Sequence, residues 1–252
     1  VYDLGGGTFD ISILKIEHGI FEVLATNGDT FLGGDDFDRL IQQYWIDQYS
    51  FEVDEQPALM QTLRLAAEKA KKALSTQQEY SSKIHNIECR IDATTFADLA
   101  MPLIERTLVA CKNALRDAEL SVDAIDEIVM VGGSTRMPLV QEAVATFFDK
   151  ALNNELNPDE VVAIGAAVQA DILAGNNKDI LLLDVTPLSL GIETVGGLMD
   201  TIIARNTKVP IKAGRQYTTS VDGQKNLKVS VFQGERDLVA DNRKLGQFVL
   251  RG

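Results

Sequence analysis

Two aspartates and a threonine surround a run of three glycines near the start of the chain. Asp3 precedes Gly5-Gly6-Gly7, Thr8 follows it, and Asp10 lies two residues further on. Glycine reaches positive φ and lets backbone N–H groups approach a ligand closely, so such a turn can cradle phosphates. Carboxylates on both sides and a hydroxyl in the loop suit a polyphosphate site with Mg²⁺ or K⁺. The residues alone also allow a plain glycine-rich hairpin turn.

A second set of polar side chains falls at helical spacing. Residues 57–77 read as a helix, and within it Glu68, Lys71 and Ser75 occupy positions i, i+3 and i+7. They therefore project from nearly one face. One interpretation is a polar wall that hydrogen-bonds a nucleoside, and the other is an ordinary solvated face with a Glu–Lys pair.

A third glycine motif links a strand to a helix. Gly132-Gly133-Ser134-Thr135-Arg136 follows an aliphatic strand at 125–131 and precedes a helix that ends near Phe148. Backbone N–H groups at a helix start can meet a phosphate or ribose. Arg136 can lie flat over a base or pair with a surface carboxylate. Asp159 belongs to a further helix start in the run 157–160.

These motifs are positioned by alternating strands and helices. Strand patterns at 9–13 and 20–26 form a hairpin, and a helix from about 35 to 49 has Asp35 as its expected cap. A helical pattern spans 94–119, with Pro102 expected to open its longer second part. The region from 185 onward carries strand signals only, including the hairpin turn Asp222-Gly223, and predicts an antiparallel sheet.

The seam between these regions is the apolar run 180–183 followed by Asp184. It is too short for a membrane helix and too apolar for a solvated linker. From the residues alone it is either a buried first strand of the second domain or a segment that docks and undocks.

Composition narrows the function classes. The 252 residues are 45% hydrophobic and 24% charged, and the formal net charge is -13. This balance is typical of a globular protein and argues against a nucleic-acid or anionic-membrane surface. Cys89 and Cys111 lack metal-site spacing and are expected to be reduced thiols of an intracellular protein. We see no signal-peptide pattern in the sequence, and its start inside a strand without Met leads us to expect a fragment.

Four motifs occur in one order and together resemble the DnaK-type 70-kDa heat-shock chaperones. They are residues 3–10, 131–138, 157–160 and 181–194, and the resemblance covers essentially the whole chain. It implies an α/β actin-like (ribonuclease H-like) ATPase lobe followed by an incomplete all-β antiparallel sandwich. The implied boundaries are 1–174 for the second ATPase lobe, 175–187 for the linker and 188–252 for the first part of the peptide-binding domain.

The resemblance also implies roles for individual residues, with ATP/ADP, Mg²⁺ and K⁺ as ligands. Asp3 and Thr8 match catalytic positions, and Asp3 and Asp10 match the metal and monovalent-cation shell. The first lobe, with its catalytic Lys and Glu, would lie upstream of Val1, so we expect this chain alone not to hydrolyse ATP efficiently. Nucleotide-binding positions are matched by Gly5, Gly6, Gly7, Thr8, Glu68, Lys71, Ser75, Gly132, Gly133, Ser134, Arg136 and Asp159.

In the second half the resemblance implies coupling and peptide binding. Leu181, Leu182, Leu183 and Asp184 match the coupling linker. An extended peptide would bind through main-chain hydrogen bonds and a pocket for one large aliphatic side chain. The matching positions are Ile192, Thr194, Val195, Tyr217, Ser220, Leu227 and Val229, for which sandwich core is the alternative.

The implied partners are a J-domain co-chaperone, an extended hydrophobic peptide and a nucleotide exchange factor, in the bacterial cytoplasm or an organelle matrix. The short connection 78–92 and the runs 106–111 and 248–252 look more like the HscA branch, which serves iron–sulfur cluster assembly through a scaffold client. A general DnaK-type folding chaperone and a non-catalytic protein-binding fragment are the alternatives.

Overall fold

The computed structural model describes residues 1–153, 157–158, 160–176, 180–219 and 221–251. The chain divides into two compact units. The first comprises Val1–Ile13 and Asn27–Lys178, and the second comprises Leu14–Thr26 and Asp179–Gly252. Within the described residues, no helix is both long and apolar enough to cross a membrane.

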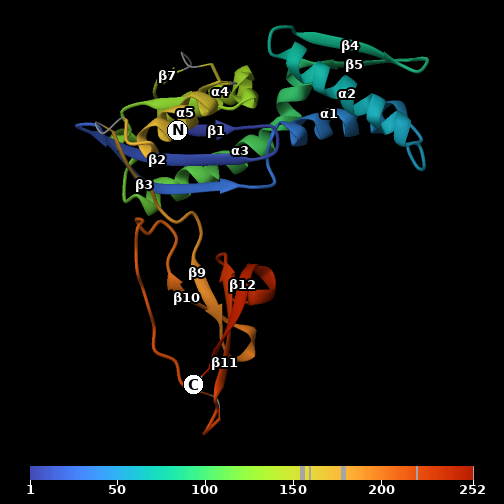
Figure 1. Ribbon diagram of the computed structural model, residues 1–252. Helices are drawn as coiled ribbons and strands as arrows, with labels where there is room; N and C mark the ends of the chain where they lie inside the picture. The colour runs from blue at the N-terminus through green and yellow to red at the C-terminus, as the bar shows by residue number, and fades with distance from the viewer. Residues whose placement is uncertain (154–156, 159, 177–179, 220, 252) are drawn as a thin grey trace. The chain divides into compact units, whose positions relative to one another are not determined.

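A mixed sheet forms the centre of the first unit (Figure 1). Its strands lie in the order β7 (Leu152–Asn153), β6 (Ile128–Val131), β1 (Tyr2–Leu4), β2 (Phe9–Glu17) and β3 (Ile20–Asp29). β1 pairs antiparallel with β2 and parallel with β6. Every second residue at the start of β2 is buried, as the alternating sequence predicts. The tips of β2 and β3, residues 14–26, cluster with the second unit.

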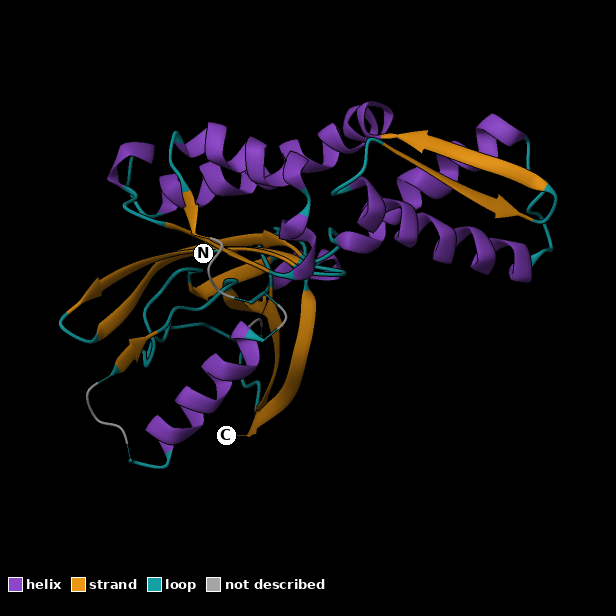
Figure 2. Ribbon diagram, turned by 90° about the horizontal axis from the view of Figure 1, so that it is seen from above, coloured by secondary structure: helices purple, strands orange, loops and turns teal. Residues whose placement is uncertain are grey.

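The helices of the first unit are α1 (Gly34–Tyr49), α2 (Pro57–Leu74), α3 (Ala93–Asp117), α4 (Pro138–Phe148) and α5 (Val161–Leu173), with 3₁₀ turns at Val122–Ala124 and Gly133–Arg136. α1 packs on α2, and the hairpin β4 (Glu79–Ile84) and β5 (Ile87–Asp92) covers this pair (Figure 2). Trp45 is fully buried in α1, and its indole N–H donates to the carbonyl of Arg90 on β5 at 3.0 Å.

Two expectations about helix boundaries were wrong. Pro102 lies inside the continuous helix α3 and does not open a new one. Asp35 is not the cap of α1, because the helix begins after Gly33 and the Gly33 N–H donates to the carboxylate of Asp36 at 2.8 Å. Asp36 reaches back because it stands at the third helical position, where a side chain can satisfy an N–H before the helix.

The second unit is built from strands, as the sequence predicts. The expected hairpin turn Asp222-Gly223 is wrong, because residues 211–219 before it form no strand. Its antiparallel sheet has the order β10 (Met199–Ile203), β9 (Leu190–Glu193), β11 (Asn226–Gln233) and β12 (Arg243–Arg251). 3₁₀ turns lie at Val195–Gly197 and Val239–Asp241. The strand β8 (Leu181–Leu183) pairs in parallel with the tip of β3, residues 20–22. The chain is thus a mixed α/β part followed by an antiparallel β part.

Candidate functional site

The glycine turn after β1 rests on the start of α1. The Gly34 N–H donates to the carbonyl of Gly5 at 2.9 Å, and the Asp35 N–H donates to that of Gly6 at 2.8 Å. Both carbonyls therefore point toward the helix. In the described part of the structure the N–H groups of Gly6 and Gly7 have no hydrogen-bond acceptor, and both residues are exposed. This leaves two backbone donors free for an anion.

Glycine at position 33 makes this close approach feasible. A Cβ added to Gly33 would lie 2.4 Å from the nitrogen of Gly7 and 2.5 Å from its Cα. Any side chain at position 33 would therefore displace the turn. The close packing of two backbones explains the Gly33-Gly34 pair, whose role was open at the level of sequence.

The second glycine motif approaches the same turn from the other side. Ser134 Oγ donates to the carbonyl of Gly5 at 2.9 Å. Gly132 has φ of 88°, and a Cβ there would lie 2.4 Å from the carbonyl oxygen of Leu4 and 2.7 Å from a carboxylate oxygen of Asp3. The motifs at 5–7 and 132–134, far apart in sequence, thus form one cluster.

Lys71 connects α2 to this cluster. Its ammonium donates to the carbonyl of Gly34 at 2.8 Å and lies 2.8 Å from Asp38 Oδ1. Both side chains are almost fully buried, and Asp38 Oδ1 has an ion pair but no hydrogen bond within the described residues. Burial raises the pKa of the Asp38 carboxyl, and the Lys71 charge opposes that shift. Sequence reasoning missed Asp38, which occupies a buried position of α1 between Phe37 and Ile41.

The other two residues of the expected polar wall are not buried with Lys71. Glu68 pairs with Lys72 at 2.6 Å, and this partner lowers the pKa of the Glu68 carboxyl. Ser75 caps the C-terminal end of α2 and donates to the carbonyl of Lys71 at 3.4 Å. The sequence allowed a Glu–Lys pair on this helix face, and Glu68 does form one, but its partner is Lys72 and not Lys71.

Asp3 and Asp10 face each other across the β1–β2 pair. Burial raises the pKa of the Asp3 carboxyl, and the charge of Asp10 adds to this effect. The pKa of Asp10 is raised by burial as well. A cation bound beside Asp3 and Asp10 would favour the ionised carboxylates and so oppose the rise in both pKa values. Among the described residues, no group of three or more His, Cys, Asp or Glu could hold a metal, so a cation here would rely on water or phosphate oxygens as well.

The remaining expected residues lie around this cluster or outside the described chain. Thr8 is exposed, and its carbonyl accepts from the Gly5 N–H at 3.0 Å. Gly133 begins the 3₁₀ turn that presents Ser134. Arg136 donates to the side-chain oxygen of Asn157 at 3.2 Å. Asp159 lies outside the described residues.

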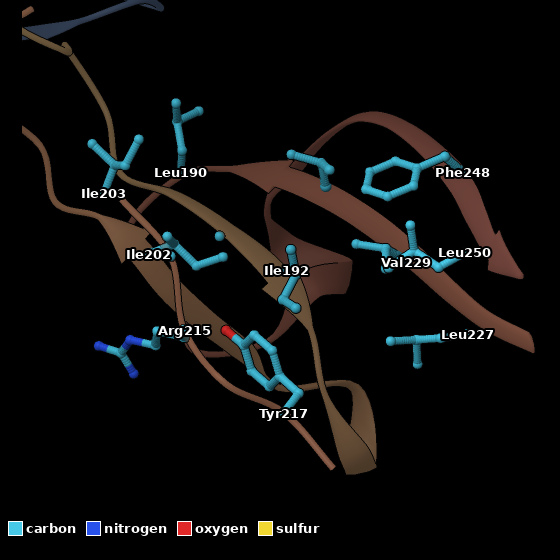
Figure 3. Close-up of a pocket in the computed structure, with 13 residues that line it drawn as sticks. Leu190, Ile192, Ile202, Ile203, Arg215, Tyr217, Leu227, Val229, Phe248 and Leu250 are labelled. Atoms are coloured by element: carbon cyan, nitrogen blue, oxygen red, sulfur yellow. The ribbon is translucent and has the colours of Figure 1, made fainter. Parts of the chain in front are cut away.

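A separate apolar pocket of about 430 Å³ lies on the sheet of the second unit. Of the expected peptide-binding residues, Ile192, Tyr217, Leu227 and Val229 line it (Figure 3). Further lining side chains include Leu190, Ile202, Ile203, Val231, Phe248 and Leu250, which sequence reasoning did not single out. For the side chains on β9, β11 and β12 the signal was the alternation along the strand, which places every second residue on one face. Ile202 and Ile203 are neighbours on β10 and follow no such alternation.

Two expected peptide-binding residues do not line the pocket. Val195 is 86% exposed in a 3₁₀ turn. Thr194 Oγ1 donates to the carbonyl of Leu198 at 3.1 Å, so its hydroxyl closes the local turn. Ser220 lies outside the described residues.

The apolar run at the seam is a strand rather than a buried core segment. Leu181, Leu182 and Leu183 form β8, whose first N–H donates to the carbonyl of Gly19 at 3.0 Å. Leu181 and Leu182 stay 52% and 42% exposed, which argues against the interpretation as a fully buried first strand. Asp184 turns its carboxylate onto the N–H of Val185 at 2.8 Å.

Comparisons with known proteins give one family. The family described as Hsp70 protein matches residues 1–252. The chaperone protein HscA of Pectobacterium carotovorum is 51% identical over 254 residues, covering 100% of this chain and 41% of that protein. The HscA of Klebsiella pneumoniae is equally similar, with the same coverage.

The chaperone protein DnaK of Prochlorococcus marinus is also 51% identical, over 266 residues, covering 100% of this chain and 42% of that protein. HscA and DnaK proteins are therefore equally close in identity. The chain spans about two fifths of the length of these relatives.

Proposed function

The chain belongs to the Hsp70 family, and from this premise we propose that it is part of an ATP-dependent chaperone. Its first unit binds ATP, its second unit binds extended apolar peptides, and β8 couples the two activities. The observation that carries this proposal is the convergence of Gly5–Gly7, Lys71 and Ser134 on one hydrogen-bonded turn.

The free N–H groups of Gly6 and Gly7 suit phosphate oxygens, because backbone donors held by a rigid neighbour need no reorganisation on binding. Thr8 is exposed beside them. Glu68, Ser75, Gly132, Gly133, Arg136 and Asp159 are proposed as nucleoside contacts. The buried ion pair of Lys71 makes that residue a support of the turn in the structure described here.

Asp3 and Asp10 are the proposed residues for Mg²⁺ and K⁺. Burial and mutual repulsion raise the pKa of the Asp3 carboxyl, so a cation is the natural partner of this pair. Mg²⁺ would supply charge neutralisation of the phosphates. Asp3 would then orient the attacking water, and Thr8 would contact the phosphate that is transferred.

The apolar pocket supports peptide binding by the second unit. Its lining side chains are aliphatic and aromatic apart from Arg215 and the Tyr217 hydroxyl, and the two glycines Gly191 and Gly214 complete it. A large aliphatic side chain of an extended peptide fits such a lining, with β-strand-like main-chain contacts around it. Thr194, Val195 and Ser220 are proposed as contacts to the peptide outside the pocket itself.

The proposed partners are a J-domain co-chaperone, a nucleotide exchange factor and an apolar client. We favour the HscA branch, with an iron–sulfur scaffold client, because HscA relatives align over 254 residues and a DnaK relative needs 266. The alignment with HscA therefore contains fewer gap positions than the alignment with DnaK, which agrees with the short β4–β5 hairpin of this chain. A general DnaK-type folding chaperone is the second candidate.

Calorimetric titration of the purified chain with ATP, in Mg²⁺ and K⁺, tests the nucleotide half. Saturable binding that weakens at least tenfold in Glu68→Ala and is absent without Mg²⁺ is the expected result. Lys15→Met, which removes an exposed ion pair on the β2–β3 hairpin, is the matched control and should bind normally. A folded chain that binds no ATP would contradict this half and leave a non-catalytic peptide-binding protein as the function.

A further inference from the structure

One wall of the apolar pocket is a segment without regular secondary structure. Residues 211–219 belong to no helix or strand, yet Gly214, Arg215 and Tyr217 of this segment line the pocket. The rest of the lining comes from β9, β10, β11 and β12, which are paired strands. One side of the pocket is therefore fixed by a sheet, and the other depends on whatever holds the segment.

A single carboxylate holds the segment. Asp200 on β10 accepts from Arg215 Nη1 at 2.6 Å with one oxygen and from the Tyr217 hydroxyl at 2.7 Å with the other. Within the described part of the chain, these are the hydrogen bonds that residues 211–219 make. Hydrogen bonds to an ionised acceptor are the stronger kind.

The position of Asp200 explains why it takes these partners. In the β9–β10 pairing Asp200 lies directly across from Ile192, so both side chains stand on the same face of the sheet. That face carries the apolar lining of the pocket. A carboxylate beside apolar side chains loses hydration and needs charged or polar partners. Arg215 and Tyr217 supply them only when the segment lies against the sheet.

The Tyr217 hydroxyl remains a hydrogen-bond donor throughout the physiological range. Burial, followed by the bond to Asp200, raises its pKa to about 12. The bond therefore orients the aromatic ring at neutral pH, and Figure 3 shows that ring beside Ile192 at the rim of the pocket. Ring and guanidinium are both placed by the same acid.

We propose that Asp200 is a positioning residue that clips the segment 211–219 to β10 and so forms the wall that makes the pocket selective for one large aliphatic side chain. This inference rests on the proposed peptide-binding function. With the clip closed, the pocket has a formed wall before the peptide arrives, which lowers the ordering cost of binding. With the clip broken, the wall is lost, and burial of a large side chain in the pocket contributes less to the free energy of peptide binding.

The test is peptide binding by fluorescence anisotropy, with a labelled heptapeptide that carries a central Leu and the same peptide with a central Ala. Asp200→Asn should raise the Kd for the Leu peptide roughly fivefold and that for the Ala peptide less than twofold, which corresponds to a lost preference between the two. Tyr217→Phe keeps the ring but removes its anchor and should act in the same direction. The double variant should be no weaker than Asp200→Asn, because both changes break the same contact.

Asp237→Asn is the matched control. It removes one exposed carboxylate from the second unit and touches neither the pocket nor the segment, so its two Kd values should equal those of the unchanged chain. An Asp200→Asn chain that keeps its preference for Leu, or effects that add in the double variant, would overturn the proposal.

A second measurement needs no peptide and separates this inference from the function on which it rests. The ¹⁹F spectrum of the chain labelled with 3-fluorotyrosine should show a Tyr217 resonance, identified by its loss in Tyr217→Phe, that shifts in Asp200→Asn and not in Asp237→Asn. A shifted resonance in a chain that binds neither peptide would support the clip and refute peptide binding. An unmoved resonance would refute the clip whatever the peptides do.

Discussion

Lys71 and Asp38 form a buried ion pair, with 2.8 Å between the ammonium nitrogen and Asp38 Oδ1. The same ammonium donates to the carbonyl of Gly34, whose N–H in turn holds the carbonyl of Gly5. The pair therefore connects α1 and α2 to the glycine turn through a single helix start. A change at either residue should be felt both in stability and at the proposed phosphate site.

We predict that Asp38→Asn destabilises the first unit by about 3 kcal/mol, because it leaves a buried ammonium without its counter-charge. Urea unfolding followed by the fluorescence of Trp45 measures this loss. Glu88→Gln, which breaks an exposed pair with Arg90 in the first unit, should cost less than about 1 kcal/mol. Equal losses in the two variants would show that the buried pair has no special role.

The stability lost in Lys71→Met should depend on pH, in a direction that follows from the raised pKa of Asp38. Burial raises the pKa of Asp38 above its usual value, so its ionised form is disfavoured in the folded state. In Lys71→Met the free-energy cost of burying the ionised Asp38 carboxyl grows, because the positive charge beside it is gone. Protonation of the carboxyl removes that cost. The deficit of Lys71→Met relative to the unchanged chain should therefore shrink as pH falls from 7 to 5, whereas that of Asp38→Asn should not. Parallel pH profiles for both variants would contradict this.

The close approach of two backbones at Gly33 gives a third prediction. Gly33→Ala should abolish ATP binding, because the new Cβ would lie 2.4 Å from the nitrogen of Gly7 and push the turn from its place. Gly165→Ala is the matched control. Its Cβ would meet nothing within 4 Å in α5, so ATP binding should be unchanged and stability should rise by about 0.5–1 kcal/mol. Calorimetry measures ATP binding, and thermal unfolding measures the change in stability. ATP binding by Gly33→Ala would show that the close approach at Gly33 is not needed to hold the phosphate-binding turn.

Both cysteines should be inert until the first unit unfolds. Burial raises the pKa of Cys89 to about 11 and that of Cys111 to about 12, so both thiols stay protonated at pH 8 in the folded chain. Iodoacetamide should modify them only at the rate of unfolding. Fast labelling of the folded chain would contradict the structure.

The raised thiol pKa values also predict a loss of stability at alkaline pH. The unfolded thiols ionise near pH 9, whereas the folded ones hold their protons to pH 11 or above. The free energy of unfolding should therefore fall as pH rises above 9, by about 1.4 kcal/mol per pH unit for each thiol. Cys111→Ala should show a shallower fall between pH 9 and 10. An unchanged slope would exclude Cys111 as a contributor.

Much of the architecture could be predicted from local patterns. The alternation at 9–13 and the aliphatic run at 125–131 indicated strands, and the second of these forms only over 128–131. The pattern at 57–77 indicated a helix, which forms over 57–74 as α2. These signals come from burial of one face, which the sequence repeats at every turn or pleat. The glycine motifs at 5–7 and 132–133 could be predicted to approach a ligand or a backbone because only glycine permits that approach.

What the sequence did not predict depends on long-range packing. The sequence predicted that Glu68, Lys71 and Ser75 project from one helix face, but only Lys71 is buried. Its long side chain turns inward to the buried carboxylate of Asp38 on α1. Pro102 is accommodated within α3, although proline more often opens a helix. The contacts of Asp200 join a strand to an irregular segment, and such contacts leave no periodic trace.

The last prediction concerns β8 and its neighbours. The Glu22 carboxylate on β3 forms an ion pair with Lys208, and the N–H of Thr26 donates to the Asn206 side chain at 3.1 Å. Glu22 is aligned with Leu183 of β8, and Lys208 bridges to Val185 just beyond it. The ion pair therefore joins β3 to the segment that pairs with Val185, at the C-terminal end of the proposed coupling segment.

Lys208→Glu should place two like charges together and loosen β8. Hydrogen exchange at the N–H of Leu181, which donates to the carbonyl of Gly19, reports that loosening. Exchange should become about fivefold faster, the effect of about 1 kcal/mol on local opening. Adding Glu22→Lys to Lys208→Glu should restore the slow rate, because the pair is then reversed but intact. Lys212→Glu, which changes an exposed lysine with no ion pair within the described residues, should leave the rate unchanged. If the charge reversal failed to restore slow exchange, the ion pair would not be what keeps β8 on β3.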